Sequence, residues 1–188
     1  MRLTAPRIPP VDPANLTDEQ REVLHSYEGR RPVVPNIVTT LAHTPKGLKA
    51  FLGWSFYVLS ANNSLPARQR EIVTLRVAYR CRSGYEFTHH AHVGLDAGLT
   101  EDEISKVKDG PGSDWAADDA ALIRATDELV SDHFISEATW QELNDHFDQR
   151  QCMDVVLTAG QYTQVSMMLN TFGVQMEDGL EVDADFKP

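Results

Sequence analysis

The 188-residue sequence contains only two cysteines, Cys81 and Cys152, and they lie far apart. This separation excludes a disulfide-rich scaffold and a C-x-x-C redox motif. The sequence also lacks any run that approaches the roughly 18 apolar residues of a membrane span, and its N-terminus lacks the apolar core of a signal peptide. These absences predict a soluble, cytoplasmic protein that does not interact with membranes.

Basic residues are also scarce, since 17 lysines and arginines stand against 28 acidic residues and give a net charge of −11. Nucleic-acid binding needs a basic patch, so this composition predicts no nucleic-acid partner. Neither a Gly-rich phosphate loop nor a G-x-S-x-G motif is present. What the sequence does contain is 41% hydrophobic residues, enough to form the core of one domain of this length.

The hydrophobic residues recur at helical spacing, and no segment alternates with the period of a strand. The capping pattern Thr100-x-x-Glu103 marks one helix start. We therefore predict an all-α fold, a single-domain helical bundle of about eight helices joined by short loops. The predicted helices include residues 45–60, 65–80, 85–97 and 150–172.

Both ends of the chain differ from the middle. Residues 1–15 contain four prolines, which predict an extended N-terminal arm because proline lacks an N–H and restrains its predecessor. Residues 177–188 are acidic, and we expect them to form a loose tail. The helical domain is predicted to span residues 16–176.

Polar residues with reactive side chains gather on the predicted helix pair 65–97. Glu86 and His90 lie four residues apart, hence on one face of the second helix, and Glu71 lies one turn inside the first. A carboxylate near an imidazole can orient the ring and support proton transfer. We predict that Glu71, Glu86 and His90 are catalytic; the same spacing is also typical of a solvated surface pair.

Ser83, Tyr85 and His89 flank this group and are predicted to bind the substrate. The helix N-terminus near Ser83 carries a partial positive charge that favours an anionic group. His89, His90 and His92 suggest a metal site, but neighbouring helix positions diverge by about 100°. No second cluster supplies the remaining ligands. We therefore predict no metal and no other cofactor.

The order and spacing of these motifs resemble the carboxymuconolactone decarboxylase family, which belongs to the alkylhydroperoxidase D-like superfamily. The resemblance covers roughly residues 35–176. It implies an all-α fold, assembly as a homo-oligomer (a trimer or hexamer) and a substrate pocket lined by the polar helix pair. The matching segments are LPARQREIVTLRVA at 65–78, YEFTHH at 85–90, AGLT at 97–100 and the stretch 160–174.

In the peroxidase branch, the motif is a glutamate, a C-x-x-C and a histidine four residues after the second cysteine. Glu71 and His90 match this pattern, whereas Ser83 and Glu86 stand at the two cysteine positions. Without a thiolate there is neither attack on peroxide nor a resolving disulfide. The resemblance therefore implies decarboxylase-type proton chemistry, without a cofactor, on a small carboxylated or lactone substrate.

Two alternatives remain open from the sequence. The protein could be an alkylhydroperoxidase-like antioxidant protein that uses Cys81 alone. It could also be a non-catalytic oligomeric binding module on the same fold, because a fold hosts many functions.

Overall fold

The computed structural model describes residues 2–27, 34–112 and 114–187, and these ranges contain nine α-helices, two short 3-10 helices and no strand. The predicted all-α fold is therefore confirmed. The α-helices are α1 (Asp18–His25), α2 (Asn36–Leu41), α3 (Pro45–Leu59), α4 (Ala67–Arg80), α5 (Gly84–Asp96), α6 (Glu101–Asp109), α7 (Ala117–Asp132), α8 (Glu137–His146) and α9 (Gln149–Phe172); the 3-10 helices are Pro13–Asn15 and Ala184–Phe186.

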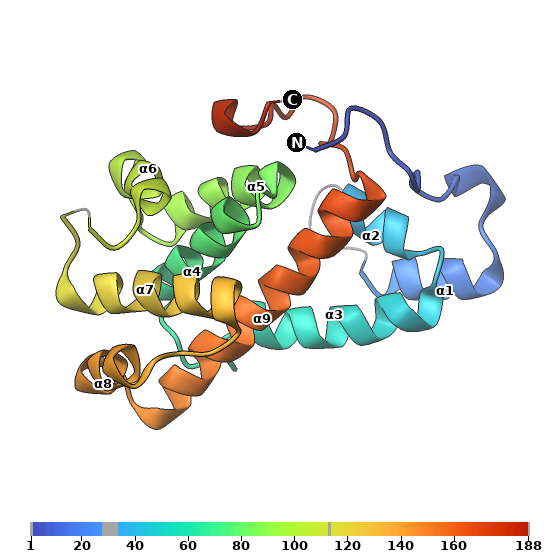
Figure 1. Ribbon diagram of the computed structural model, residues 1–188. Coiled ribbons are helices and arrows are strands. Elements are labelled where there is room, and N and C mark those ends of the chain that lie inside the picture. The colour runs from blue at the N-terminus through green and yellow to red at the C-terminus, as the bar shows by residue number, and fades with distance from the viewer. Residues whose placement is uncertain (1, 28–33, 113, 188) are drawn as a thin grey trace.

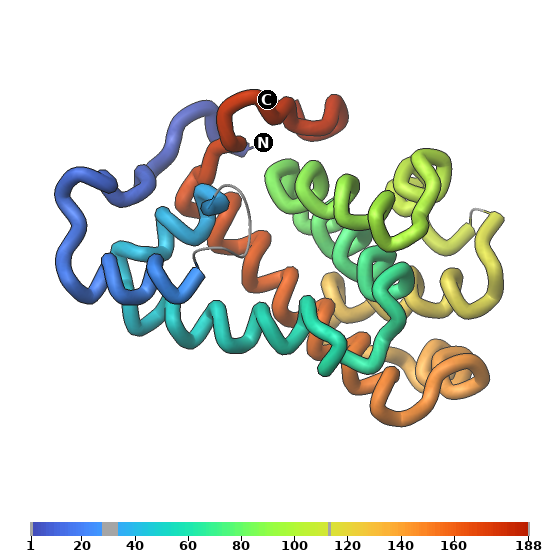
Figure 2. Tube along the Cα trace, turned by 180° about the vertical axis from the view of Figure 1, so that it is seen from behind, coloured from blue at the N-terminus to red at the C-terminus, as the bar shows by residue number. Residues whose placement is uncertain are grey.

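Helix α9 runs through the middle of the molecule and separates the other helices into two groups (Figure 1). Helices α1, α2 and α3 lie on one side and α4 to α8 on the other, as the view from behind also shows (Figure 2). From Val155 to Phe172 the sequence of α9 contains no charged residue, which suits a helix packed between two groups. No helix in the described ranges combines the length and apolar character needed to cross a membrane.

Helix α4 is buried without interruption over residues 71–78. This stretch includes Arg76, and a buried charge must be paired. Its guanidinium donates two hydrogen bonds to Asp127 of α7, at 2.7 and 2.8 Å, and a third to the carbonyl oxygen of Val107 in α6, at 2.7 Å. These contacts hold α4 against α6 and α7. They thereby fix the position of the α4 surface that packs on α5.

Helix α4 begins at Ala67, two residues later than predicted, because Pro66 takes the N-cap position. Ser64 instead donates both its hydroxyl and its backbone N–H to Asp154 of α9, and Tyr57 of α3 donates its hydroxyl to the same carboxylate at 2.7 Å. One buried carboxylate therefore joins α3, α9 and the loop before α4.

The N-terminal arm lies along the body of the protein. The backbone N–H groups of Arg7 and Ile8 donate to the carbonyl oxygen of Phe172, at 2.8 and 3.2 Å, which is the end of α9. The ring of His43 lies 3.0 Å from the carbonyl oxygen of Pro9. Over residues 2–15 the arm contains only the short 3-10 helix, in agreement with the helix-breaking effect of its prolines.

The C-terminal segment 177–187 is packed rather than loose, which corrects our expectation for the acidic tail. Phe186 is buried, and its ring centroid lies 5.2 Å from that of Phe87 in α5. Lys108 of α6 pairs with Asp183 at 2.9 Å. An aromatic anchor and a counter-ion across the contact therefore hold a segment whose composition alone favours solvent.

Candidate active site

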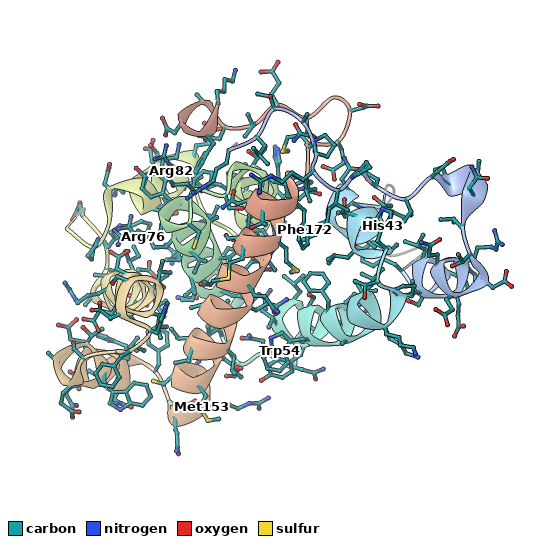
Figure 3. The ribbon with its side chains drawn as sticks, turned by 45° about the vertical axis from the view of Figure 1, so that its right-hand side comes forward. His43, Trp54, Arg76, Arg82, Met153 and Phe172 are labelled. Atoms are coloured by element: carbon teal, nitrogen blue, oxygen red, sulfur yellow. The ribbon has the colours of Figure 1, made fainter. Side chains whose placement is uncertain are left out.

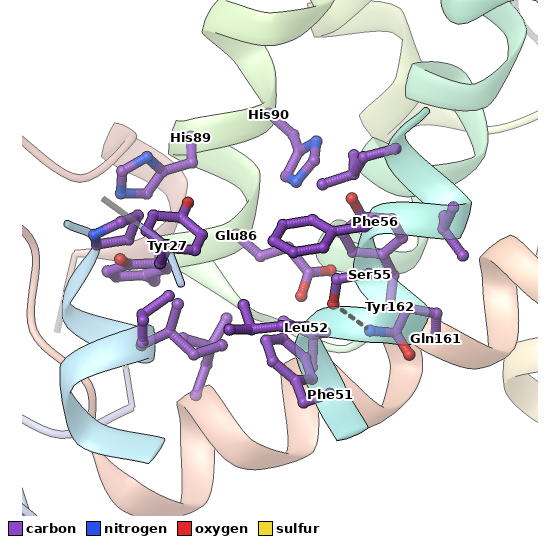
Figure 4. Close-up of a pocket in the computed structure, with 18 residues that line it drawn as sticks. Tyr27, Phe51, Leu52, Ser55, Phe56, Glu86, His89, His90, Gln161 and Tyr162 are labelled. Carbon is purple, nitrogen blue, oxygen red and sulfur yellow. Dashed lines mark hydrogen bonds between the residues drawn. The ribbon is translucent and has the colours of Figure 1, made fainter. Parts of the chain in front are cut away.

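A cavity of about 250 Å³ opens between α2, α3, α5 and α9 (Figure 4). Most of its wall is apolar or aromatic, with a few polar side chains that converge on it, which is the usual form of a small-molecule site. The lining residues are Tyr27, Pro35, Ile37, Val38, Phe51, Leu52, Ser55, Phe56, Val58, Leu59, Tyr85, Glu86, His89, His90, Gln161, Tyr162, Val165 and Leu169.

Helix α5 supplies the reactive side chains of this cavity. Figure 4 shows Glu86, His89 and His90 projecting into it opposite Ser55 of α3 and Tyr162 of α9. The spacing of four residues between Glu86 and His90 brings both to one helical face, as the sequence predicts. Four of the six predicted site residues line the cavity: Tyr85, Glu86, His89 and His90.

His90 takes its carboxylate partner from α4. Its Nδ1 lies 2.6 Å from Oε2 of Glu71, whose side chain is fully buried behind the cavity wall. Because a carboxylate only accepts hydrogen bonds, Nδ1 donates to Glu71, and this bond favours the tautomer whose lone pair is on Nε2. The ring of Tyr162 stands nearly perpendicular to the imidazole, with centroids 4.8 Å apart. Two contacts therefore fix the orientation of His90.

Glu86 is a buried acid with one free oxygen. It is 2% exposed, its Oε1 accepts a hydrogen bond from Ser166 at 3.2 Å, and its Oε2 has no partner in the described part of the chain. Burial raises the pKa of the Glu86 carboxyl well above its ordinary value, and the hydrogen bond from Ser166 offsets only part of this effect. Glu86 therefore favours its protonated form, a proton donor at the cavity wall.

Helix α9 contributes two polar residues that the sequence analysis did not single out. Gln161 donates its amide to the hydroxyl of Ser55 at 3.0 Å, the contact dashed in Figure 4. Burial raises the pKa of Tyr162, and the negative charge of Glu71 adds to the effect, so its hydroxyl stays neutral. Polar residues recur along α9, so the sequence does not distinguish this pair from its neighbours.

A second imidazole–carboxylate pair forms at His89. Its Nε2 lies 2.7 Å from Oε2 of Glu177, whose Oε1 accepts hydrogen bonds from the Tyr85 hydroxyl and from the backbone N–H of Asn36, the latter at 2.7 Å. Burial acts to raise the pKa of Glu177, but these hydrogen bonds outweigh it and lower the pKa to about 2. The sequence analysis missed Glu177 because its partners lie 88 to 141 residues away.

Ser83 lies outside the cavity, unlike the other residues predicted to bind substrate. Its side chain is fully buried, and its hydroxyl has no hydrogen-bond partner among the described residues. The C-terminal segment covers this end of α5 so closely that a Cβ added at Gly84 would lie 2.6 Å from Cβ of Phe186. The helix N-terminus is therefore closed to a ligand at the place where the sequence predicts an anion site.

Cys81 lies near Glu86 but does not line the cavity. Burial raises the pKa of its thiol, and the carboxyl of Glu86 raises it further. A reactive cysteine needs the opposite shift, so this position disfavours a thiolate. Within the described ranges no group of three or more His, Cys, Asp or Glu side chains is placed to hold a metal ion, and His92 is exposed.

The central part of the chain matches a known sequence family. Residues 45–128 match the model of the carboxymuconolactone decarboxylase family. This stretch runs from α3 into α7 and includes Glu71, Glu86 and His90, whereas Tyr162 and Glu177 lie beyond it. No curated protein sequence gives a significant match to the chain.

Solved structures of low sequence identity share the fold over nearly the whole chain. A cysteine-to-alanine variant of the debrominase Bmp8 in complex with 2,3,4-tribromopyrrole is 12% identical, with a TM-score of 0.76 over 93% of this chain and 94% of that one. An uncharacterized peroxidase-related protein from Silicibacter sp. TM1040 is 16% identical, with a TM-score of 0.77 over 94% and 92%. An uncharacterized peroxidase-related protein with an alkylhydroperoxidase AhpD core, from Ralstonia eutropha JMP134, is 20% identical, with a TM-score of 0.70 over 92% and 93%. At these identities the likeness establishes the AhpD-like fold alone.

Proposed function

We propose that this cavity performs cofactor-free general acid–base chemistry on a small, uncharged unsaturated molecule such as a lactone. The observation that carries the proposal is that one apolar cavity contains both a candidate base and a candidate acid. His90, oriented by Glu71, offers the lone pair of Nε2, and Glu86, kept protonated by burial, offers a proton. Environments that push an acid and a base toward opposite protonation states are typical of proton-transfer sites.

The cavity lining favours an uncharged substrate over the carboxylated type that the sequence also predicts. Among the described residues that line it there is no lysine or arginine. The two imidazoles that line it already face carboxylates, Glu71 and Glu177. Among these described residues, a substrate carboxylate would thus find no free counter-charge to offset its desolvation. A lactone carbonyl, by contrast, can accept a hydrogen bond from the Glu86 carboxyl.

For a β,γ-unsaturated lactone, the proposed reaction is a 1,3-proton transfer. His90 Nε2 removes a proton from the carbon between the carbonyl and the double bond, and the C–H electron pair becomes a dienolate. The dienolate oxygen accepts a hydrogen bond from Glu86, while Glu71 stabilises the imidazolium. A proton then adds to the far carbon of the dienolate and gives the conjugated lactone. One C–H bond breaks and one forms, with no net oxidation.

The test uses α-angelica lactone, whose conjugated isomer absorbs at longer wavelength. We expect the wild-type protein to isomerise it, and His90→Gln and Glu86→Gln to lower kcat by about 10²–10⁴-fold, the usual contribution of a general acid or base. His90→Gln should keep nearly the wild-type Tm, and Glu86→Gln should melt no lower than the wild type. The control is His92→Gln, an exposed neighbour on α5, which should retain full activity.

Two outcomes would contradict this proposal. Loss of the fold in both variants would indicate a structural role for the buried polar residues. Binding of the lactone to the wild type without conversion, in the same assay followed by NMR, would favour the non-catalytic binding module.

A further inference from the structure

We propose that His89 is a second acid–base residue of this cavity and that Glu177, from the C-terminal segment, is its positioning residue. The inference rests on the proposed function and deepens it, because it places two imidazoles around one substrate. Glu177 lies outside the stretch that matches the family. The second pair therefore joins His89, inside the matched stretch, to a residue beyond it.

The two imidazoles present opposite nitrogen atoms. His90 is bound to Glu71 through Nδ1, which leaves Nε2, and His89 is bound to Glu177 through Nε2, which leaves Nδ1. Neighbouring helix positions diverge by about 100°, so the two rings approach from different directions. Both nevertheless line the same cavity, with the Glu86 carboxyl between the helix and the opposite wall (Figure 4).

Glu177 is suited to hold an imidazole rather than to exchange a proton itself. Its two oxygens accept from His89, Tyr85 and the backbone of Asn36, and only 13% of its side chain is exposed. With a pKa lowered to about 2 against the opposing effect of burial, it remains an anion at neutral pH. As a permanent acceptor it fixes the proton of His89 on Nε2.

The surroundings of His89 restrain the ring on a second side. The Tyr85 ring packs on it with centroids 4.5 Å apart and planes inclined by 41°. Among the described residues, the ionisable groups in contact with the ring are Glu177 from the C-terminal segment and Tyr85 from its own helix. Burial and the hydrogen bond to Glu177 both raise the pKa of Tyr85, so it stays a neutral donor.

The role of Glu177 is separable from the docking of its segment. Phe186 anchors the segment in the core, Lys108 pairs with Asp183, and the backbone N–H of Asp183 donates to the Thr88 hydroxyl at 2.9 Å. These contacts lie six or more residues beyond Glu177. A substitution of Glu177 should therefore leave the segment in place and change only what it touches.

Two bases allow a proton to leave one carbon and a different proton to reach another. With a single imidazole, part of the substrate hydrogen returns to the product on the same nitrogen. With His90 as the base and His89 as the donor at the far carbon, His89 Nδ1 first takes a proton from solvent and its ring becomes an imidazolium beside the Glu177 carboxylate. That proton then passes to the far carbon, and His90 releases the substrate proton to solvent. In deuterated water, the wild-type product should carry deuterium at the new C–H position. His89→Gln and Glu177→Gln should raise the fraction of retained substrate hydrogen.

The first measurement needs no turnover. In protein labelled with ¹⁵N-histidine, we expect His89 to be protonated on Nε2 and unprotonated on Nδ1, and Glu177→Gln to convert this into a mixture of tautomers. The matched control is Glu181→Gln, in the same segment but with a 90% exposed side chain, which should leave the spectrum unchanged. A proton on Nδ1 of His89 in the wild type, or no effect of Glu177→Gln, would overturn the assignment.

The second measurement is turnover of α-angelica lactone. We expect Glu177→Gln and His89→Gln to lower kcat about tenfold or more, as loss of a partner that orients a reactive imidazole does elsewhere, with little change in KM. Wild-type kcat and isotope pattern in both variants, with His90→Gln inactive, would overturn this inference and leave the proposed function standing.

A wild type that does not convert the lactone would instead remove the proposed function. Titration with phenol, which can donate to Nδ1, then decides the inference. A phenol-dependent shift of the His89 Nδ1 resonance that Glu177→Gln abolishes would support it. The absence of any shift would overturn it.

Discussion

At the scale of single residues, Glu86 and Glu177 are two acids that the fold treats in opposite ways. Among the described residues, Ser166 is the one hydrogen-bond donor to Glu86, so burial dominates and the pKa of Glu86 rises. Glu177 is also partly buried, but three donors surround it and its pKa falls. The number of donors, and not burial alone, therefore decides which acid of this site carries a proton.

The raised pKa of Glu86 makes stability fall as pH rises. Its neutral form stabilises the fold fully below its ordinary pKa of 4.5, and this contribution is lost as pH climbs toward the folded-state pKa. Because glutamine cannot ionise, we expect Glu86→Gln to gain stability relative to wild type between about pH 5 and pH 8, measured by urea unfolding. A difference between the two proteins that does not vary with pH would contradict the buried-acid assignment.

The lowered pKa of Glu177 acts in the other direction. Its contribution is present above its ordinary pKa of 4.5 and is lost as pH falls from 4.5 toward about 2. We expect Glu177→Gln to be less stable than wild type by about 1–3 kcal/mol at neutral pH after allowance for solvent screening, and by much less in acid. Glu181→Gln is the control, and equal deficits at both pH values would contradict the prediction.

At the scale of elements, α5 is held between α4 and the C-terminal segment, and the closest approach is at Gly84. An added Cβ would lie 2.6 Å from Phe186 Cβ and 2.8 Å from Val182 Cγ2. We expect Gly84→Ala to destabilise the protein by about 1–3 kcal/mol in denaturant unfolding, as overpacking does. The matched control is Gly53→Ala in α3, where an added Cβ meets nothing within 4 Å.

The clash at Gly84 can be checked with a double variant. If Phe186 is the obstacle, the effects of Gly84→Ala and Phe186→Gly on the free energy of unfolding should not add, because Phe186→Gly removes the Cβ that lies 2.6 Å from the added one. Full additivity would contradict the proposed clash.

What the sequence could predict depended on how far apart the interacting residues lie. Thr100 and Glu103 form the predicted capping box, and Glu86 and His90 share a face, because both relations act within one turn of helix. Glu71 could also be predicted, because the family resemblance covers both helices of the pair that contains it. Glu177 could not be predicted, because the residues around it in the sequence do not distinguish a carboxylate that contacts His89 from one that is exposed to solvent.

At the scale of the whole molecule, the homo-oligomer that the sequence predicts stays a prediction, and the outer face of α9 is where we would test it. Met153 and Met167 are 56% and 59% exposed, and Trp54 of α3 is 39% exposed; Figure 3 shows Trp54 and Met153 at the surface. Gly160 lies on the same face, with open space above it. Apolar surface of this kind is typical of protein interfaces.

We expect Met167→Glu to shift the protein toward the monomer in sedimentation velocity. A buried charge at an apolar interface would weaken association. Phe134→Glu is the control, because Phe134 is 70% exposed but lies between α7 and α8, away from α9. An assembly size that Met167→Glu leaves unchanged would contradict the use of this face.

Because His89 and Glu177 lie 88 residues apart in the sequence, their pairing also has a consequence for the synthesis of the protein on the ribosome. The family-like helices α4 and α5, with Glu71, Glu86 and His90, are synthesised first, but α9 and Glu177 follow much later. A nascent chain that stops before residue 177 contains His89 without its carboxylate partner, and one that stops before α9 lacks one wall of the cavity. Under the proposed function, full activity should therefore appear only after translation has passed this point.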